Sequence, residues 1–304
     1  MNDLDINNIE LLRNKDYCDD YIHIEWRITY LCNYDCSYCK QKGSRSKKII
    51  PLDVDFLKKV AVKINSIIDS ASKPCYLTLV GGEPTLIDIP YFLENIFISK
   101  NIKCIKIISN FSKNVEFYNK INEISIKRNI IDNFNFSLHE EFVEAEKFFE
   151  KLKQLTFSSF YIEMVVTKDN IKIAKKVKDL AEKNNFTLKF DINSKDVNFD
   201  FPKEFINSTH SKYFFIKYRD NTELKKIDNN IVRYYKKEFK NVYCNSKIIF
   251  INQKGFINFF NCKKYSFNLL TFPESLYSTI FNTKRIKCEN VTCSLCGAME
   301  LEFR

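Results

Sequence analysis

The segment Cys32 to Cys39, CNYDCSYC, places three cysteines within eight residues. It follows the run from Ile22 to Tyr30, in which apolar and polar residues alternate. Alternation with a period of two predicts a half-buried strand. The segment is therefore expected to form the loop after a strand, with Cys32, Cys36 and Cys39 as a group of thiols.

The spacing C-x3-C-x2-C of these thiols is typical of metal ligands. Three thiolates can hold three irons of a 4Fe-4S cluster and leave the fourth iron open to another ligand. A zinc site or buried free thiols are the alternatives. Structural zinc sites generally use four ligands, often as paired C-x2-C units, so a lone trio favours the cluster without excluding zinc.

Strand-like and helix-like patterns alternate through the first two thirds of the chain, and this predicts parallel βα units. Asp53 is expected to cap a helix that contains Phe56 and Ile67. In such folds, chemistry gathers at the carboxyl ends of the strands. The remaining expected strands are Tyr76 to Val80, Ile102 to Ile108, Phe134 to Leu138, Ile162 to Val166 and Phe186 to Phe190, and further helix patterns begin near Phe142 and Ile173.

A second group of cysteines follows a polar, proline-containing segment at 193–211 that is expected to be a linker. Two short strands around the turn NQKG predict a hairpin at 247–260, flanked by Cys244 and Cys262. Cys293 and Cys296 form a C-x2-C pair. Together these four thiols complete a ligand set for iron-sulfur or zinc.

Composition sets outer bounds on function. The chain has 304 residues, 11 cysteines and a formal net charge of +10. Its lysines are scattered along amphipathic stretches, so nucleic-acid binding is not favoured. The acidic N-terminus does not resemble a signal peptide and no apolar run has the length of a membrane span, so a cytoplasmic protein is expected. In a reducing compartment cysteines serve as ligands or are buried.

The stretch VGGEPTL, Val80 to Leu86, follows the second expected strand. Together with Cys32, Cys36, Cys39 and the aromatic Tyr38, it resembles the radical S-adenosylmethionine (radical SAM) superfamily. The resemblance covers about Tyr21 to Ile192 and implies a partial (β/α)6 barrel. It also implies that the open iron of the cluster binds S-adenosylmethionine, which is reductively cleaved to a 5′-deoxyadenosyl radical that abstracts a substrate hydrogen.

The resemblance implies cofactor-binding roles for further residues. Gly81, Gly82, Glu83 and Pro84 match the loop that meets the methionine amino group. Ser109-Asn110-Phe111 stands where relatives have Thr-Asn-Gly, so the Phe111 side chain is expected in a turn normally open to the cofactor. Ser137 resembles the hydroxyl residue that contacts the cofactor's ribose or carboxylate, and Lys168 stands where many relatives carry an arginine for the carboxylate. Both residues also fit a solvated strand end. His139 is a candidate catalytic residue, with a polar helix cap as the alternative.

The late cysteines resemble the "twitch" form of a C-terminal domain related to SPASM, which implies one auxiliary 4Fe-4S cluster held by Cys244, Cys262, Cys293 and Cys296. Such a cluster implies electron transfer during a two-electron oxidation. Cys288 is a further candidate, as a ligand or hydrogen-atom donor. The expected division is an N-terminal extension at 1–20, the barrel at 21–200, and a small α+β domain with the hairpin at 201–304.

The sequence leaves three alternative functions for the chain. The first is an oxidoreductase acting on a small molecule such as an amino-sugar, cyclitol or glycan precursor. The second is a maturase that oxidises, cross-links or epimerises a residue of a ribosomally synthesised peptide, and the third is a non-catalytic zinc-binding module. The first two imply two 4Fe-4S clusters, S-adenosylmethionine and a reducing partner such as flavodoxin or ferredoxin, and neither requires a membrane.

Overall fold

The computed structural model describes most of the first two thirds of the chain and separate segments of the last third. These are residues 8–14, 20–39, 53–71, 73–193, 202, 205, 213–220, 225–228, 240–246, 248–259, 266–277, 286–290 and 299–303.

The fold is mixed α/β and is built on a nine-stranded sheet with the order β13-β12-β11-β2-β3-β4-β5-β6-β7. Its strands from β2 to β7 are all parallel and follow one another in chain order. This confirms the predicted series of parallel strands. They are β2 (Ile22–Thr29), β3 (Cys75–Gly81), β4 (Ile102–Ser109), β5 (Ile131–Leu138), β6 (Phe160–Val166) and β7 (Leu188–Ile192).

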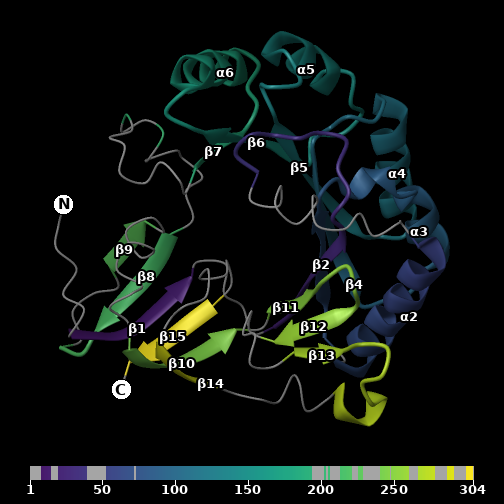
Figure 1. The fold of residues 1–304 in the computed structure, drawn as a ribbon, viewed down its shortest axis with the longest axis vertical. Coiled ribbons are helices and arrows are strands. Elements are labelled where there is room, and N and C mark those ends of the chain that lie inside the picture. Colours follow the sequence, from purple (N-terminus) through teal and green to yellow (C-terminus); the bar gives the residue numbers. More distant parts are fainter. Residues whose placement is uncertain are drawn as a thin grey trace.

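Helices connect the parallel strands and follow the outer side of the sheet (Figure 1). Asp53 caps the first of them, as predicted, because the Phe56 N–H donates to its carboxylate at 2.9 Å. The helix expected from Phe142 begins only at Ala145, since residues after His139 form a turn. The helices are α2 (Val54–Ala71), α3 (Ile89–Asn95), α4 (Val115–Lys127), α5 (Ala145–Leu152) and α6 (Ile171–Lys183), with a 3-10 turn η2 (Pro84–Leu86) before α3.

The two faces of the parallel sheet differ sharply in polarity. Alternate residues such as Trp26, Leu79 and Phe136 are fully buried in the core shared with the helices. The opposite face, called here the inner face, carries the intervening residues. They are largely polar: His23, Glu25, Arg27, Tyr76, Thr78, Lys106, Asn133, Asn135, Ser137, Tyr161, Glu163, Lys189 and Asp191.

The predicted hairpin is present as β11 (Ile248–Ile251) and β12 (Phe256–Phe259), joined by the NQKG turn. Gly255 in that turn has a φ of 73°, a conformation that favours glycine. The hairpin extends the large sheet, because β11 pairs in parallel with β2 and β13 (Ser266–Asn268) pairs with β12. The Gln253 side chain accepts a hydrogen bond from the Tyr30 N–H at 2.8 Å, which ties the turn to the end of β2.

A second sheet of six strands has the order β14-β10-β15-β1-β8-β9 and is antiparallel (Figure 1). Its strand β1 (Ile9–Asn14) lies between two strands from the other end of the chain, and the sequence patterns did not predict it. The others are β8 (Tyr213–Tyr218), β9 (Lys225–Asp228), β10 (Lys240–Ser246), β14 (Ile286–Asn290) and β15 (Met299–Phe303). Within the described residues, no helix has the length and apolar character needed to cross a membrane.

An ion pair on the inner face joins Glu163 of β6 to Lys189 of β7 at 2.8 Å, with both side chains about one fifth exposed. Asn135 donates a hydrogen bond to the other oxygen of Glu163. Burial by itself would raise the pKa of Glu163, but the Lys189 ammonium outweighs it and the pKa is lowered. Burial by itself would lower the pKa of Lys189, but the Glu163 carboxylate outweighs this effect and the pKa is raised. Both groups are therefore charged.

Replacing Lys189 with Met should destabilise the protein by about 3 kcal/mol, because it leaves the Glu163 charge buried and unpaired. The pair's contribution is present above the ordinary glutamate pKa and is lost as the pH falls through the lowered pKa of Glu163. The cost of Lys189→Met should therefore shrink below about pH 4. Urea unfolding at several pH values measures both effects.

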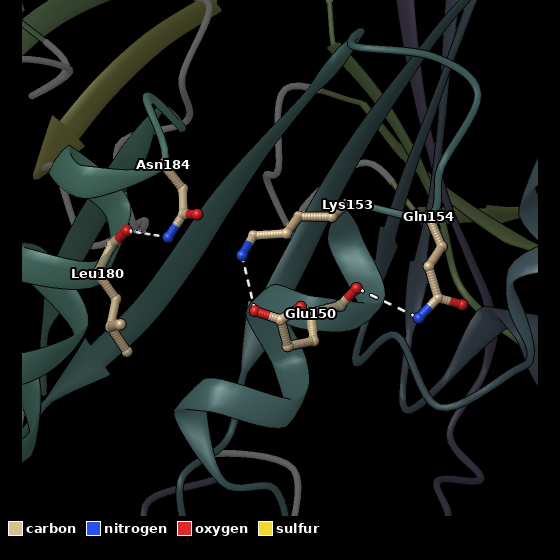
Figure 2. Close-up of polar contacts among 5 residues, drawn as sticks. All are labelled: Glu150, Lys153, Gln154, Leu180 and Asn184. Carbon is tan, nitrogen blue, oxygen red and sulfur yellow. Dashed lines mark hydrogen bonds and ion pairs between the residues drawn. The ribbon is translucent and has the colours of Figure 1, made fainter.

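The matched control is the exposed pair of Glu150 and Lys153 at the C-terminal end of α5, which are joined at 2.6 Å (Figure 2). Lys153→Met should cost no more than about 0.5 kcal/mol, since solvent screens this pair. Equal costs at the two sites would contradict the buried-charge argument.

Candidate active site

The cysteine loop begins where β2 ends, at the carboxyl edge of the parallel strands. Cys36 is 4% exposed, and Cys32 and Cys39 are half-buried. The loop turns tightly, because the Cys39 N–H donates to the Cys36 carbonyl at 3.1 Å and the Tyr34 N–H points at the Cys32 sulfur at 3.4 Å. The structure therefore places three thiols on one short loop at the edge where βα loops meet.

Gly81 and Gly82 at the end of β3 lie directly against the chain leaving β2. A Cβ atom on Gly81 would stand 2.1 Å from the Thr29 carbonyl oxygen, and one on Gly82 would stand 2.0 Å from that of Leu31. The Gly82 N–H donates to Thr29 at 2.8 Å and the Glu83 N–H to Leu31 at 2.7 Å. The close approach requires glycine at both positions. The two hydrogen bonds hold the backbone at Thr29 and Leu31 in place, directly before the first cysteine of the loop.

Glu83 is fully buried and its carboxylate accepts hydrogen bonds from neighbouring loops. One oxygen accepts from the Thr85 N–H at 2.9 Å and the Thr85 hydroxyl at 2.7 Å, and the other accepts from the Asn110 N–H at 2.6 Å. Burial raises the pKa of Glu83, while these donors oppose the rise. Glu83 thus joins the β3–α3 loop to the β4–α4 loop. Thr85, within the quoted VGGEPTL stretch, was not singled out from sequence.

Asn110 extends this connection to the cysteine loop. Its side-chain amide donates to the Asn33 side chain at 2.8 Å and lies 3.9 Å from the Cys32 sulfur. The structure therefore brings Asn110, Glu83 and the first cysteine together, as expected for residues of one site.

The expectation that Phe111 fills the turn on the cofactor side is wrong. Phe111 has a φ of 57°, the left-handed conformation that glycine adopts most easily, so the turn keeps its shape without glycine. Its ring is 3% exposed and packs in the core against Phe136 and Tyr118, at centroid distances of 4.2 and 4.8 Å. The Lys151 ammonium lies over the same ring and donates to the Phe111 carbonyl at 2.6 Å.

The turn after β5 contacts the cysteine loop from the other side. His139 Nδ1 lies 3.3 Å from the Cys36 sulfur and 2.9 Å from the Tyr38 hydroxyl. Glu141 accepts a hydrogen bond from the Ser37 N–H at 2.9 Å and another from its hydroxyl. The Phe142 ring stacks on Tyr34 with a centroid distance of 4.6 Å. His139 therefore reaches the cysteines, and Glu141 is a contact that sequence reasoning missed.

The remaining predicted site residues of the first domain are Ser137 and Lys168. Ser137 is half-buried on the inner face, in register with Glu163. Lys168, in the turn before α6, is exposed. In that turn Asn170 donates to Glu140 at 2.5 Å, and its side-chain oxygen accepts from the Thr167 N–H at 2.8 Å. Burial raises the pKa of Glu140.

The late cysteines are described only in part. Cys244 lies in β10 opposite Ile286, and Cys288 lies in β14 opposite Val242. Both therefore belong to adjacent strands of the antiparallel sheet, whereas the hairpin belongs to the large sheet. Cys262, Cys293 and Cys296 lie outside the described residues.

The chemistry of the first cysteine set fits an iron-sulfur cluster. The pKa of the Cys36 thiol is raised to about 12, first by burial and then by the negative charges of Glu141, Cys32 and Cys39. Neighbouring thiolates that repel one another are stabilised by bound iron, and each thiolate of a cubane binds a different iron. Among the described residues, no group of three His, Cys, Asp or Glu side chains converges on a single metal ion.

Comparison with known proteins gives limited similarity. No protein-family model matches the chain, and no curated protein does. A crystal structure of BtrN in complex with AdoMet and 2-DOIA aligns with 18% identity and a TM-score of 0.37, over 47% of this chain and 56% of that one. Selenomethionine BtrN in an open conformation aligns with 11% identity and a TM-score of 0.39, over 91% of each chain. The first alignment thus spans little more than half the length of BtrN.

The buried, left-handed Phe111 generates a stability prediction. Phe111→Ala should destabilise the protein by about 3 kcal/mol through the lost packing. Phe111→Gly should be about 1 kcal/mol more stable than the alanine variant, because glycine adopts a positive φ without the steric cost that alanine has. Thermal and urea unfolding of both variants measures the difference.

Phe134 in β5 is the control, since it is equally buried and is not among the described residues with positive φ. There the glycine variant should be less stable than the alanine variant by about 0.5–1 kcal/mol. The same order of stability at both positions would argue against a strained backbone at Phe111.

Proposed function

We propose that the chain is a radical SAM oxidoreductase with the corresponding partial (β/α)6 barrel. The observation that carries the proposal is the C-x3-C-x2-C loop whose start is fixed by Gly81 and Gly82. Cys32, Cys36 and Cys39 would hold a 4Fe-4S cluster. When bound, the cluster would supply the electron for reductive cleavage of S-adenosylmethionine to a 5′-deoxyadenosyl radical, which would abstract a substrate hydrogen atom.

The chain's own residues bind and orient the cofactor in this proposal. Tyr38, Glu83, Pro84 and Asn110 line the loops around the cysteines, with Ser137 and Lys168 at neighbouring strand ends. The N–H groups of Gly82 and Glu83 are bonded within the protein, so they are not donors to a ligand. A cationic amino group needs acceptors rather than donors. The Glu83 carboxylate is fully buried and already accepts from Thr85 and Asn110, so in this proposal it orders the loops around the cofactor and does not contact it.

The substrate is proposed to be a small polar molecule such as an amino-sugar, cyclitol or glycan precursor. Support comes from the inner face of the parallel sheet, whose side chains are largely polar. Several of its buried atoms, including Asn133 Oδ1, Asn135 Oδ1 and Arg27 Nε, make no hydrogen bond within the protein. Buried polar groups are generally satisfied by a partner, so a polar ligand or water is expected to complete them.

The net reaction is proposed to be a two-electron oxidation that uses an auxiliary 4Fe-4S cluster in a twitch-like region. Cys244, Cys262, Cys293 and Cys296 would hold that cluster, and Cys288 would be a reserve ligand or hydrogen-atom donor. A fully ligated cluster has no open iron, which suits it to accept an electron from the substrate radical. The first electron would come from a reducing partner such as flavodoxin or ferredoxin.

Anaerobic reconstitution with iron and sulfide tests the catalytic cluster. The protein should bind about eight irons, corresponding to two cubanes, and should convert S-adenosylmethionine to 5′-deoxyadenosine under reduction. Replacing Cys32, Cys36 and Cys39 together with Ala should abolish the conversion, because those thiols hold the cluster. Iron analysis and chromatographic detection of 5′-deoxyadenosine are the measurements.

Cys75 provides the matched control, since it is fully buried in β3 within the core. Cys75→Ala should leave the iron content and the cleavage unchanged. Binding of zinc without any iron-dependent cleavage would refute the enzyme proposal and favour a zinc-binding module.

The auxiliary cluster has a separate test. Replacing Cys293 and Cys296 with Ala should reduce bound iron to about four per chain while leaving reductive cleavage of S-adenosylmethionine, because the catalytic cluster keeps its own ligands. Iron content and 5′-deoxyadenosine yield are measured in parallel. Complete loss of cleavage in this variant, with the first cluster still bound, would contradict the electron-transfer role.

A further inference from the structure

The sulfur of Cys36 lies beside two polar groups, neither of which belongs to the proposed ligand set. His139 Nδ1 is 3.3 Å from it. The Tyr38 hydroxyl is 2.9 Å from the same ring nitrogen and also forms a side-chain hydrogen bond with Cys36. A thiolate accepts hydrogen bonds and has no proton to donate. In the tautomer that carries its hydrogen on Nδ1, His139 can donate to Cys36 once the thiol is deprotonated, and the Tyr38 hydroxyl can donate to the same sulfur.

The His139 ring is held in this position by packing against two neighbouring rings. The Tyr34 ring meets it edge-on at 5.8 Å and 82°, and the Tyr38 ring lies nearly parallel to it at 6.1 Å and 17°. The Glu141 carboxylate bonds the Ser37 N–H and hydroxyl, which fixes the turn after β5 to the cysteine loop. A side chain restrained in this way contributes a directed hydrogen bond at little entropic cost.

The surroundings of Cys36 are otherwise unfavourable to added negative charge. The sulfur is buried, and the Glu141 carboxylate places negative charge near it. One-electron reduction adds a further negative charge to a cluster, and this setting opposes it. Hydrogen bonds to the ligating sulfurs stabilise the reduced form more than the oxidised form and are one determinant of cluster potential.

We propose that His139 and Tyr38 donate hydrogen bonds to the Cys36 thiolate and thereby raise the reduction potential of the cluster that Cys36 holds. The inference rests on the proposed function. In this role both are positioning residues that act on the iron through sulfur. The step concerned is the transfer of one electron from the external reductant to the cluster, with no bond made or broken in the protein and no proton transferred.

The test is a reductive titration of the reconstituted protein with dithionite, without S-adenosylmethionine, followed by electron paramagnetic resonance. His139→Phe and Tyr38→Phe keep an aromatic ring and remove the donor. Each should lower the equilibrium constant for reduction about tenfold, which for a one-electron couple is a shift of 59 mV to more negative potential. The double variant should be lower than either single variant.

Two further variants separate hydrogen bonding from packing. His139→Asn keeps a donor near the position of Nδ1 and should restore an equilibrium constant close to that of the unaltered protein. Phe142→Leu removes the ring stacked on Tyr34 without removing a donor, and it should leave the constant unchanged. A Phe142→Leu shift as large as that of His139→Phe would overturn the inference, because packing alone would then explain the shift.

The outcomes distinguish this inference from the function on which it rests. Failure of the unaltered protein to assemble a redox-active cluster on Cys32, Cys36 and Cys39 would refute the proposed function. A normal cluster whose reduction constant stays within twofold in both phenylalanine variants would overturn only the role of His139 and Tyr38. Where His139→Phe does not retain its cluster, Tyr38→Phe decides, and an unchanged constant there overturns the inference.

Discussion

The arrangement of the site depends on the close approach of the end of β3 to the chain that leaves β2. Gly81 and Gly82 lie so near the carbonyl oxygens of Thr29 and Leu31 that no Cβ atom fits at either position. The N–H groups of Gly82 and Glu83 donate to those same carbonyls. Steric exclusion and hydrogen bonding therefore act together, and they determine where the cysteine loop begins.

Further polar contacts spread from this point across neighbouring βα loops. Three protein donors partly offset the cost of burying Glu83, and through Asn110 it reaches the cysteine loop from one side. His139 and Glu141 reach the same loop from the turn after β5. The cysteine loop is consequently held between two sets of contacts, while the apolar face of the sheet supplies the rigid core beneath them.

Sequence patterns predicted the strands, caps and turns well where residues close together in the chain decide the structure. Period-two alternation predicted the parallel strands, Asp53 was confirmed as a helix cap, and NQKG was confirmed as a hairpin turn. The helix start at Phe142 was wrong, because residues after His139 turn toward the cysteine loop and Phe142 stacks on Tyr34 instead. Strand β1 was missed, since its pairing partners come from the other end of the chain.

The sequence by itself determined the series of parallel strands from β2 to β7, the half-buried character of β2, the hairpin, and the loop that carries Cys32, Cys36 and Cys39. Those features follow from spacing and periodicity, which act between near neighbours in the chain. Only the tertiary structure decided that β11 pairs with β2, that the Phe111 ring turns into the core, and that His139 lies at the Cys36 sulfur. Each of these is a contact between distant residues, and packing of the whole sheet selects it.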